Sequence, residues 1–437
     1  MLDYIVLIHC GSYFCLPEDS CSLVYEPLGN KGFFVDKKHA ESISRQIRDG
    51  VSDKEFATFS SGANIKDFVC QPNSPTTIQL LLNEKCNFSC SYCYSAKSRD
   101  PIEMPIEVLE SAIKWLHNSA SSSGNDNVAL SFVGGGEPLL SWPLIVRAVE
   151  YAEDFFERDG VANKYKVVTN GSLISKGRAV FLKRYNIITQ ISFEIIAEVQ
   201  NTQRQCFLEV SKNLKLLGEI GVITKIRSTI TNSNVDRMCE MVAIVATEYP
   251  FVKQLSLEPV VDGECFKTAE KMHCFVERYL KSFVEAKKLA KSIGIEVFSS
   301  FSCFRRGIRR HFCGPIYSLS PDGSLTGCSH FSSNKVLGFN DFCYGKVSSK
   351  GVEIDVEKFN HMFYPKIDDL CAECWLRWRC AGGCPNHRLT YGKEVFDELC
   401  VLRRALCLNE LLDEMAYSYN KNTGRVLKDD VVRGILL

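Results

Sequence analysis

The sequence predicts an α/β protein built on a parallel sheet that is either open or curled into an incomplete barrel. Six strand-like runs alternate with six amphipathic helical segments. Such alternation is typical of parallel sheets, because a helix carries the chain back between parallel strands. The alternation starts near residue 76 and stops near residue 300, where a cysteine-rich region begins.

The chain has 437 residues, which is enough for two or three domains. We expect a small α+β domain at 1–75, an α/β core at 76–300, a cysteine-rich domain at 301–407 and a C-terminal tail at 408–437. In the first domain, apolar runs and turn residues predict strands at 5–8, 22–25 and 32–35 and a helix over about 40–47.

The elements of the core follow from hydrophobic periodicity. The expected strands are Ile78–Leu82, Val128–Val133, Tyr165–Thr169, Ile187–Ile195, Thr224–Ile230 and Gln254–Pro259. The expected helices cover roughly 104–118, 141–158, 175–184, 203–217, 234–247 and 267–293. Ligand sites in such folds lie at the C-terminal ends of the strands. The motifs described below lie at those ends.

The charge balance and the start of the chain argue against several classes of protein. Lysine plus arginine equals aspartate plus glutamate, 52 each, so we do not expect a nucleic-acid partner. The chain start lacks the basic region of a signal peptide, and no run of about 18 apolar residues suggests a membrane span. We therefore expect a soluble cytoplasmic protein with no membrane partner. In such a chain, 21 cysteines predict metal binding rather than disulfides.

A first cysteine cluster follows the first strand of the core. Cys86, Cys90 and Cys93 stand in the segment CNFSCSYC. Three thiolates on a tight loop can hold three irons of a cubane cluster, and the fourth iron then keeps the open position that a catalytic metal needs. A structural zinc loop that lacks one ligand, or free thiols, are the alternatives.

Glycine-rich and polar segments follow the next three strands. The segments are GGGEP at 134–138, TNG at 169–171 and Ser192-Phe193-Glu194, with Arg204 on the next helix. Glycines let the backbone approach a ligand closely, whereas simple turns are the alternative. Ser192 and Arg204 together can grip a carboxylate through the arginine fork, although each alone is an ordinary surface residue.

These motifs resemble those of the radical SAM superfamily. CNFSCSYCY, GGGEPLL, TNG and the Ser192–Arg204 pair occur in that family's order, and the resemblance covers roughly 76–300. It implies a partial (β/α)6 TIM-like barrel with a 4Fe-4S cluster that binds S-adenosylmethionine. The implied residues are Cys86, Cys90 and Cys93 on the cluster, Gly135, Gly136 and Glu137 at the methionine amino group, Tyr92 near the adenine, and Ser192 and Arg204 at the carboxylate.

The resemblance also implies the chemistry. The reduced cluster cleaves S-adenosylmethionine, and the resulting 5′-deoxyadenosyl radical abstracts hydrogen from an unactivated C–H bond. A donor such as flavodoxin or ferredoxin would supply the electron. The family's usual Ser-x-Asp-Gly is Ser192-Phe193-Glu194-Ile195 here, and its usual His-Asp before the arginine is Gln200-Asn201. This divergence leaves the role of Glu194 open. Glu194 and Glu258 are candidate substrate contacts or bases, because each follows or ends a core strand.

A second cysteine set occupies the C-terminal region and resembles the SPASM extension over about 300–407. The pattern is Cys313-x9-Gly323-x4-Cys328, then Cys371-x2-Cys374-x5-Cys380-x3-Cys384, then Cys400. The resemblance implies two auxiliary 4Fe-4S clusters. One is held by Cys371, Cys374, Cys380 and Cys400, and the other by Cys313, Cys328 and Cys384, with Cys303 as the candidate fourth ligand. A zinc ribbon is the alternative explanation of the C-x2-C spacing.

SPASM proteins mostly act on peptides or proteins, which gives two candidate functions. The first is a maturase that installs a thioether or carbon–carbon crosslink in a ribosomally synthesised precursor peptide. The second is an anaerobic sulfatase-maturating enzyme that makes formylglycine. In the second group an aspartate follows the cysteine equivalent to Cys328, and Ser329 stands there in this chain, which favours the maturase.

The first domain bears on the same choice. Residues 1–75 resemble a small leader-peptide recognition domain that pairs an edge strand with the precursor, and a capping subdomain is the alternative. A non-catalytic zinc-binding interaction protein is a third hypothesis for the whole chain. A tRNA-modifying radical enzyme is a fourth, against which the neutral charge balance argues.

Overall fold

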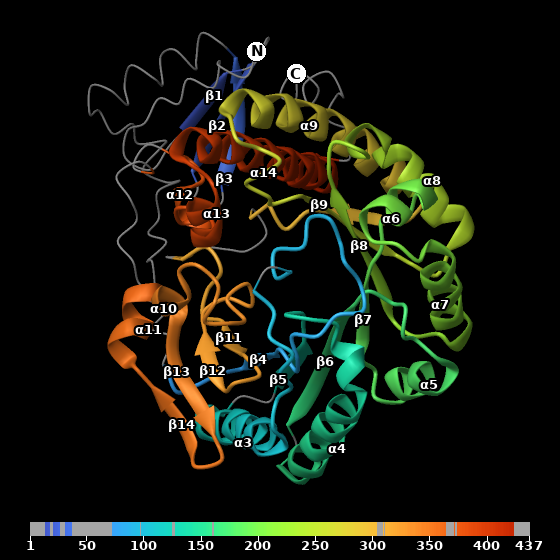
Figure 1. The fold of residues 1–437 in the computed structure, drawn as a ribbon. Helices are drawn as coiled ribbons and strands as arrows, with labels where there is room; N and C mark the ends of the chain where they lie inside the picture. Colours follow the sequence, from blue (N-terminus) through green and yellow to red (C-terminus); the bar gives the residue numbers. More distant parts are fainter. Residues whose placement is uncertain are drawn as a thin grey trace.

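The computed structural model describes residues 14–17, 21–26, 31–36, 72–96, 98–124, 127–159, 161–303, 309, 311–363, 371 and 374–423. A curved parallel sheet forms the middle of the molecule, and helices cover its outer side (Figure 1). The expected α/β class is therefore confirmed. Within the described residues, none of the helices combines the length and the apolar character that a membrane crossing needs.

All six expected core strands are present and pair in parallel in chain order. They are β4 (Thr77–Leu80), β5 (Asn127–Phe132), β6 (Ala162–Thr169), β7 (Ile188–Ser192), β8 (Thr224–Ile230) and β9 (Gln254–Pro259). A seventh parallel strand, β10 (Glu296–Phe298), pairs with β9 and was not expected, because three residues are too few to show a period. The fourth strand ends at Ser192 and not at Ile195 as expected, because Ile195 adopts a left-handed conformation with φ 68°.

The expected core helices are also present. They are α3 (Ile106–Ser123), α4 (Trp142–Asp159), α5 (Lys176–Arg184), α6 (Ala197–Gln203), α7 (Phe207–Ile220), α8 (Met238–Glu248) and α9 (Ala269–Ser292). The expected helix over 203–217 is wrong at its start. Gln205 and Cys206 have φ of 78° and 56°, so the chain breaks between α6 and α7. Arg204 consequently lies at the end of α6 and not within a continuous helix.

The cysteine-rich region extends the same sheet, which the sequence pattern did not reveal. Strand β11 (Tyr317–Leu319) pairs in parallel with β4, and antiparallel strands follow it. These strands are β12 (Ser324–Thr326), β13 (Cys343–Ser348) and β14 (Gly351–Ile354). Gly323 of the cysteine pattern forms the β11–β12 turn with φ 86°, and a Cβ there would meet Val347 O at 2.3 Å. This glycine is therefore a structural requirement of the turn.

The helices of the C-terminal region surround the cysteines. They are α10 (Phe339–Phe342), α11 (Val356–Phe363), α12 (Arg377–Cys380), α13 (Pro385–Thr390) and α14 (Lys393–Thr423). Helix α14 runs across the expected boundary between 407 and 408, so a domain and a tail do not separate there. It lies alongside α9 (Figure 1), where Lys287 donates hydrogen bonds to Asn409 at 2.8 Å and to Asp413 at 2.7 Å.

The N-terminal residues that are described form a separate three-stranded antiparallel sheet. Its strands are β1 (Phe14–Pro17), β2 (Cys21–Glu26) and β3 (Lys31–Asp36). Strands β2 and β3 confirm two of the expected strands, whereas the strand at 5–8 and the helix at 40–47 lie outside the described residues. Tyr25 of β2 is buried against Trp375, with ring centroids 5.9 Å apart. The N-terminal sheet therefore packs directly on the cysteine-rich region.

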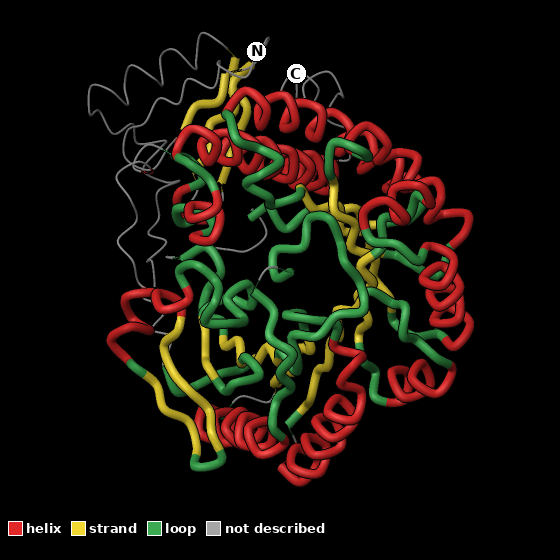
Figure 2. Tube along the Cα trace, in the orientation of Figure 1, coloured by secondary structure: helices red, strands yellow, loops and turns green. Residues whose placement is uncertain are grey.

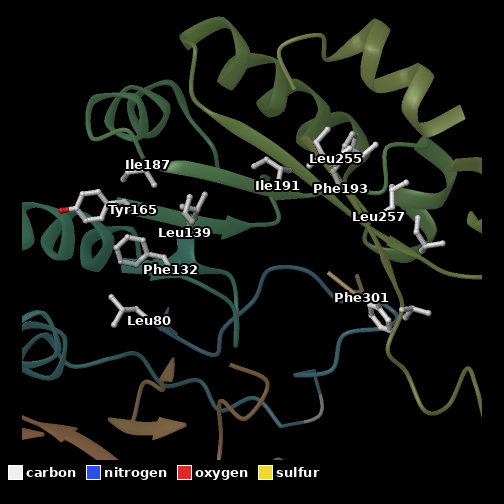
Figure 3. Packing of buried hydrophobic residues seen from close by; sticks show 14 of the residues in the cluster. Leu80, Phe132, Leu139, Tyr165, Ile187, Ile191, Phe193, Leu255, Leu257 and Phe301 are labelled. Carbon is white, nitrogen blue, oxygen red and sulfur yellow. The ribbon is translucent and has the colours of Figure 1, made fainter. Parts of the chain in front are cut away.

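The core lies between the sheet and the outer helices. Buried apolar side chains from successive strands, such as Leu80, Phe132, Ile191 and Leu255, pack into one cluster (Figure 3). The loops gather on the inner side of the curved sheet (Figure 2). This arrangement leaves the loops at the C-terminal ends of the strands as the place where polar motifs can meet.

Candidate active site and auxiliary cysteine sites

The loop after β4 carries the first cysteine cluster. Cys86, Cys90 and Cys93 are free, half-buried thiols, and Cys93 N donates to Cys90 O at 3.1 Å. Burial raises the pKa of Cys86 and of Cys90, and the charge of Cys93 acts on both. Arg99 Nη2 donates to Cys93 Sγ at 3.0 Å. The three sulfurs therefore interact with one another beside a permanent positive charge, which suits an anionic thiolate-ligated cluster.

The glycine-rich loop after β5 is bonded to the start of the cysteine loop. Gly136 N donates to Asn83 O at 3.0 Å, and Glu137 N donates to Lys85 O at 2.7 Å. A Cβ on Gly136 would lie 1.9 Å from Lys85 O, so only glycine permits this approach. Ser95 Oγ donates to Gly135 O at 2.8 Å. The glycines thus hold the cysteine loop against the sheet.

The carboxylate of Glu137 joins the glycine-rich loop to the TNG turn after β6. It is 2% exposed and accepts from Thr169 Oγ1 at 2.6 Å, from Asn170 N at 2.8 Å and from Leu139 N at 3.0 Å. Burial raises its pKa, although these donors oppose the rise. Both carboxylate oxygens have partners, so Glu137 is available to a ligand mainly through its backbone.

Arg204 is paired with Glu194, a partner that the sequence did not indicate. Arg204 Nε donates to Glu194 Oε1 at 2.8 Å and to Tyr92 Oη at 2.6 Å, and the guanidinium lies 5.5 Å from the Tyr92 ring. Tyr92 Oη donates to the same carboxylate oxygen. Burial and the Glu194 charge raise the pKa of Tyr92 well above its ordinary value, so the phenol stays neutral. Among the described residues, neither terminal nitrogen of Arg204 has a hydrogen-bond partner, so both are free to bind a carboxylate.

Glu194 is fully buried, and its second oxygen accepts from Ser228 Oγ at 2.7 Å and from Thr229 N at 2.8 Å. This carboxylate therefore orients Arg204 and is not exposed to a substrate. Ser192 is half-buried nearby and makes no hydrogen bond through its hydroxyl to any described residue. Ile195 has a left-handed backbone with φ 68° at the position where the family usually has glycine. Because isoleucine is β-branched, this conformation costs about 1–3 kcal/mol of stability.

Glu258, the other candidate base, is also enclosed. It is 3% exposed and accepts from Ser256 Oγ at 2.5 Å, from Ser300 N at 2.9 Å and from Ser300 Oγ at 2.6 Å. These bonds tie the end of β9 to the segment after β10. Glu258 therefore connects β9 to the segment after β10 and is not accessible to a ligand.

Four cysteines of the second set line one cavity. Cys371, Cys374, Cys380 and Cys400 border a space of about 360 Å³, together with several arginines. Burial raises the pKa of Cys374 to about 11, and the charge of Arg404 opposes this rise. Four thiols around one enclosed space match the ligand number of a closed 4Fe-4S cluster.

The remaining cysteines form a second group. A hydrogen bond with Cys313 lowers the pKa of Cys384 to about 6, whereas burial raises the pKa of Cys328 to about 12, with a further contribution from Cys384. Cys303 is fully buried, and its Sγ lies 3.5 Å from Cys407 Sγ. Cys303 also interacts with Cys380. The structure therefore brings Cys313, Cys328 and Cys384 together and places Cys303 beside the other set.

Several residues at these sites were not expected from the sequence. Arg99 lies on Cys93, and His330 stacks on Tyr94 with ring centroids 4.4 Å apart. The stacking connects the segment after Cys328 to the first cysteine loop. The position of Arg99, six residues after Cys93, gives no periodic signal. The adjacency of His330 to Cys328 was a weak signal that only the folded chain makes meaningful.

Comparison with known proteins identifies the class of the core. Residues 80–243 match the family model of the radical SAM superfamily. The chain is 32% identical over 129 residues to the radical SAM cyclopropyl synthase TigE of Paramaledivibacter caminithermalis, a match that covers 27% of this chain and 26% of that protein. It is 24% identical over 343 residues to a cysteine-type anaerobic sulfatase-maturating enzyme of Clostridium perfringens, covering 69% of this chain and 86% of that one.

Solved structures share the fold over most of the chain. The anSMEcpe structure with bound AdoMet has a TM-score of 0.61 at 18% identity and covers 77% of this chain and 99% of that one. Streptococcus suis SuiB bound to the precursor peptide SuiA has a TM-score of 0.51 at 15% identity and covers 85% and 94%. The chain therefore carries a radical SAM domain within a fold that these structures share, and the recognition made from its core motifs is confirmed.

The family implies a 4Fe-4S cluster and S-adenosylmethionine, and the residues present fit both. Three interacting thiols stand beside the glycine-rich loop, and both terminal nitrogens of Arg204 are without a partner among the described residues. The four-cysteine cavity fits one auxiliary cluster in the same way.

Proposed function

We propose that this chain is a radical SAM/SPASM maturase that abstracts hydrogen from a residue of a ribosomally synthesised peptide and installs a thioether or carbon–carbon crosslink. One observation carries the proposal. Three loops that follow β4, β5 and β6 are bonded into a single unit, which sets the three thiols beside the glycine-rich backbone. Arg204 belongs to the same end of the sheet through its bond to Tyr92.

The residues have distinct parts in this proposal. Cys86, Cys90 and Cys93 hold the cluster, which with S-adenosylmethionine supplies a carbon radical able to take hydrogen from an unactivated C–H bond. Arg204 receives the methionine carboxylate through its terminal nitrogens, and Glu194 fixes the orientation of that guanidinium. The bonded loops keep water away from the reacting atoms. A reductant such as flavodoxin or ferredoxin supplies the electron.

The C-terminal cysteines form the auxiliary sites of the proposal. Cys371, Cys374, Cys380 and Cys400 hold one auxiliary 4Fe-4S cluster around the 360 Å³ cavity. Cys313, Cys328 and Cys384 hold another. The sequence pattern makes Cys303 the fourth ligand of this second cluster, whereas the structure places Cys303 beside Cys407 and Cys380.

The N-terminal sheet supports a peptide substrate. Among the described strands, β1 and β3 each pair on one side only, and a precursor could add to such an edge. Tyr25 fastens this sheet to Trp375, next to Cys374. SuiB, which is bound to its precursor peptide SuiA, has a similar fold.

A formylglycine-generating function is the second candidate, because the similarity to the sulfatase-maturating enzyme of Clostridium perfringens spans 86% of that protein. Ser329 stands where that group has an aspartate, and it is half-buried beside Cys328.

A zinc-binding interaction protein is the third candidate. Among the described residues, no three His, Cys, Asp or Glu side chains gather as a ligand group for a single metal ion.

The test is anaerobic reconstitution of the full chain with iron and sulfide. We expect about 12 irons per chain, as three cubanes require, and 5′-deoxyadenosine on addition of S-adenosylmethionine and reductant. A chain in which Cys86, Cys90 and Cys93 are all alanine should form none, and persistent formation would refute the site. A crosslinked peptide loses two hydrogens and stays inert to a hydrazine probe, whereas formylglycine reacts with it. A colourless protein loaded only with zinc ends the enzyme proposal.

A further inference from the structure

The cavity lined by Cys371, Cys374, Cys380 and Cys400 is unusually rich in positive charge. Among the described residues, five cationic side chains border it, and Asp397 is the one carboxylate in that lining. Lys393 donates to Asp397 at 2.6 Å and so uses that carboxylate. The other cations of the described lining are Arg377, Arg388, Arg403 and Arg404, of which Arg388 has hydrogen-bond partners of its own. This excess of cations in the described lining favours an anionic occupant.

Arg403 is the cation that the fold buries most completely. It is 1% exposed and lies one turn after Cys400 on α14, so both side chains face the same way. Its guanidinium lies 5.3 Å from the Phe312 ring and 5.4 Å from each of the rings of Phe301 and Phe396. These rings fix the guanidinium plane and exclude water from it.

Only one nitrogen of Arg403 has a partner in the described part of the chain. Arg403 Nη2 donates to His387 Nδ1 at 2.7 Å. His387 is buried and supplies no negative charge that could balance the guanidinium. Nε and Nη1 are buried without an acceptor. No described carboxylate pairs with Arg403 either, which leaves a permanent charge and two nitrogens unsatisfied beside the cavity.

The backbone around the cavity also accommodates Arg403. Gly383, with φ 80°, lies beneath the guanidinium, and a Cβ there would come within 3.1 Å of Nη1 and 2.9 Å of the Phe396 ring. Gly383 adopts a left-handed backbone that glycine tolerates, and its lack of a side chain leaves room for the guanidinium of Arg403. Gly383 precedes Cys384, a ligand in the other proposed cluster.

We propose that Arg403 sets the reduction potential of the auxiliary cluster held by Cys371, Cys374, Cys380 and Cys400, by directing an unpaired N–H group of its guanidinium at a cluster sulfur. The inference rests on the proposed function, which supplies that cluster. A thiolate-ligated cubane gains negative charge on reduction, and both the fixed cation and the N–H···S bonds stabilise the charged state. Arg403 therefore makes this cluster a better electron acceptor.

The experiment is a potentiometric titration followed by electron paramagnetic resonance on the reconstituted full chain. The background carries alanine at Cys86, Cys90 and Cys93, so that only auxiliary clusters contribute. The relevant signal is the one that Cys374→Ala removes. Arg403→Gln should lower the reduced-to-oxidised ratio at a fixed potential roughly tenfold, which corresponds to about 59 mV for one electron.

Arg388→Gln is the matched control. Arg388 borders the same cavity, but its Nε and Nη2 already donate to Gly382 O at 3.0 and 2.8 Å. We expect a clearly smaller shift for this variant. An unchanged potential in Arg403→Gln, or equal shifts in the two variants, overturns the assignment, because either result shows that Arg403 has no specific contact with the cluster.

A conservative variant covers the case in which Arg403→Gln does not fold. Arg403→Lys keeps the charge but cannot reach both His387 and the cluster with a fixed fork, so we expect an intermediate shift, and no shift overturns the proposal. Iron content distinguishes a failure of the proposed function from a failure of the tuning role of Arg403. A parent chain that binds no cluster at the Cys374 site refutes the proposed function, whereas a bound cluster that is insensitive to residue 403 refutes only the tuning role.

Discussion

Replacing Gly136 by alanine tests directly whether the bonded loops position the cysteine cluster. A Cβ at this residue would lie 1.9 Å from Lys85 O and 2.6 Å from Asn83 Oδ1, whereas real Cβ contacts stay beyond about 3.0 Å. The glycine-rich loop and the cysteine loop must therefore separate by about 1 Å. The backbone of Gly136 itself is not left-handed, so the effect arises from crowding alone.

The expected magnitude follows from the bonds that this separation breaks. The bonds from Gly136 N to Asn83 O and from Glu137 N to Lys85 O would both stretch beyond bonding distance. Two lost hydrogen bonds cost about 1 kcal/mol each, and crowding adds about 1–3 kcal/mol. A displacement of about 1 Å at reacting groups lowers a rate on the order of 10²-fold. We expect a loss of stability of about 3–5 kcal/mol and a 5′-deoxyadenosine rate reduced by about two orders of magnitude.

The assay compares Gly136→Ala with Gly177→Ala in the reconstituted protein. Gly177 lies on exposed α5 with no atom within 4 Å of its added Cβ, so alanine there should stabilise the chain by about 1 kcal/mol. Thermal unfolding, iron content and 5′-deoxyadenosine formation are measured for both variants. If Gly136→Ala matches the parent protein in all three, the loops do not position the cluster and the reasoning about this site is wrong.

Three further predictions concern other parts of the molecule. Glu194→Ala removes the carboxylate that orients Arg204, whose side chain is only 13% exposed, and leaves the arginine charge without its ion-pair partner. We expect a loss of about 3–5 kcal/mol in stability and weaker S-adenosylmethionine binding by calorimetry, with a milder effect for Glu194→Gln. Equal binding in all three proteins would contradict the positioning role. Cys374→Ala should lower the iron content by about one third and abolish peptide product while 5′-deoxyadenosine still forms; normal product would disprove the auxiliary role. The hydrogen bond that His273 Nδ1 donates to the Glu398 carboxylate raises the pKa of His273 above its ordinary value. This link between α9 and α14 therefore contributes fully below about pH 6.5 and is lost as the pH rises through the folded-state pKa. His273 is 40% exposed, so the melting temperature should change only slightly with pH for this reason, by the equivalent of less than about 1 kcal/mol, and His273→Gln should flatten that change.

Hydrophobic periodicity was sufficient to predict the strands and helices of the core. The six strands from Thr77 to Pro259 are where alternating and buried apolar runs predict them, because local hydrophobic pattern and helix length suffice to define β-α units. The short strands β10, β11 and β12 have three residues each and could not be detected, since they exist only through pairing with distant strands. The break at Gln205 also escaped detection, because neither Gln205 nor Cys206 is a residue type that favours a left-handed conformation.

The motifs located the site, but they did not determine the contacts within it. Spacing alone grouped Cys86, Cys90 and Cys93, because ligands on one loop are close in any fold. The sequence did not predict that Glu194 is the partner of Arg204. Glu194 comes two residues after Ser192 and directly before Ile195, which has a left-handed backbone.

The sequence by itself determined the class of the fold, the cysteine groups and the family to which the core motifs point, because these depend on local periodicity and on residues a few positions apart. Only the tertiary structure decided that Glu194 and Glu258 are enclosed and that Tyr25 packs the first sheet against Trp375. It also decided that Arg403 borders a cysteine-lined cavity with no carboxylate partner among the described residues. Burial and pairing of charges depend on which distant segments pack together, and that packing follows from the energy of the whole chain and not from any local pattern.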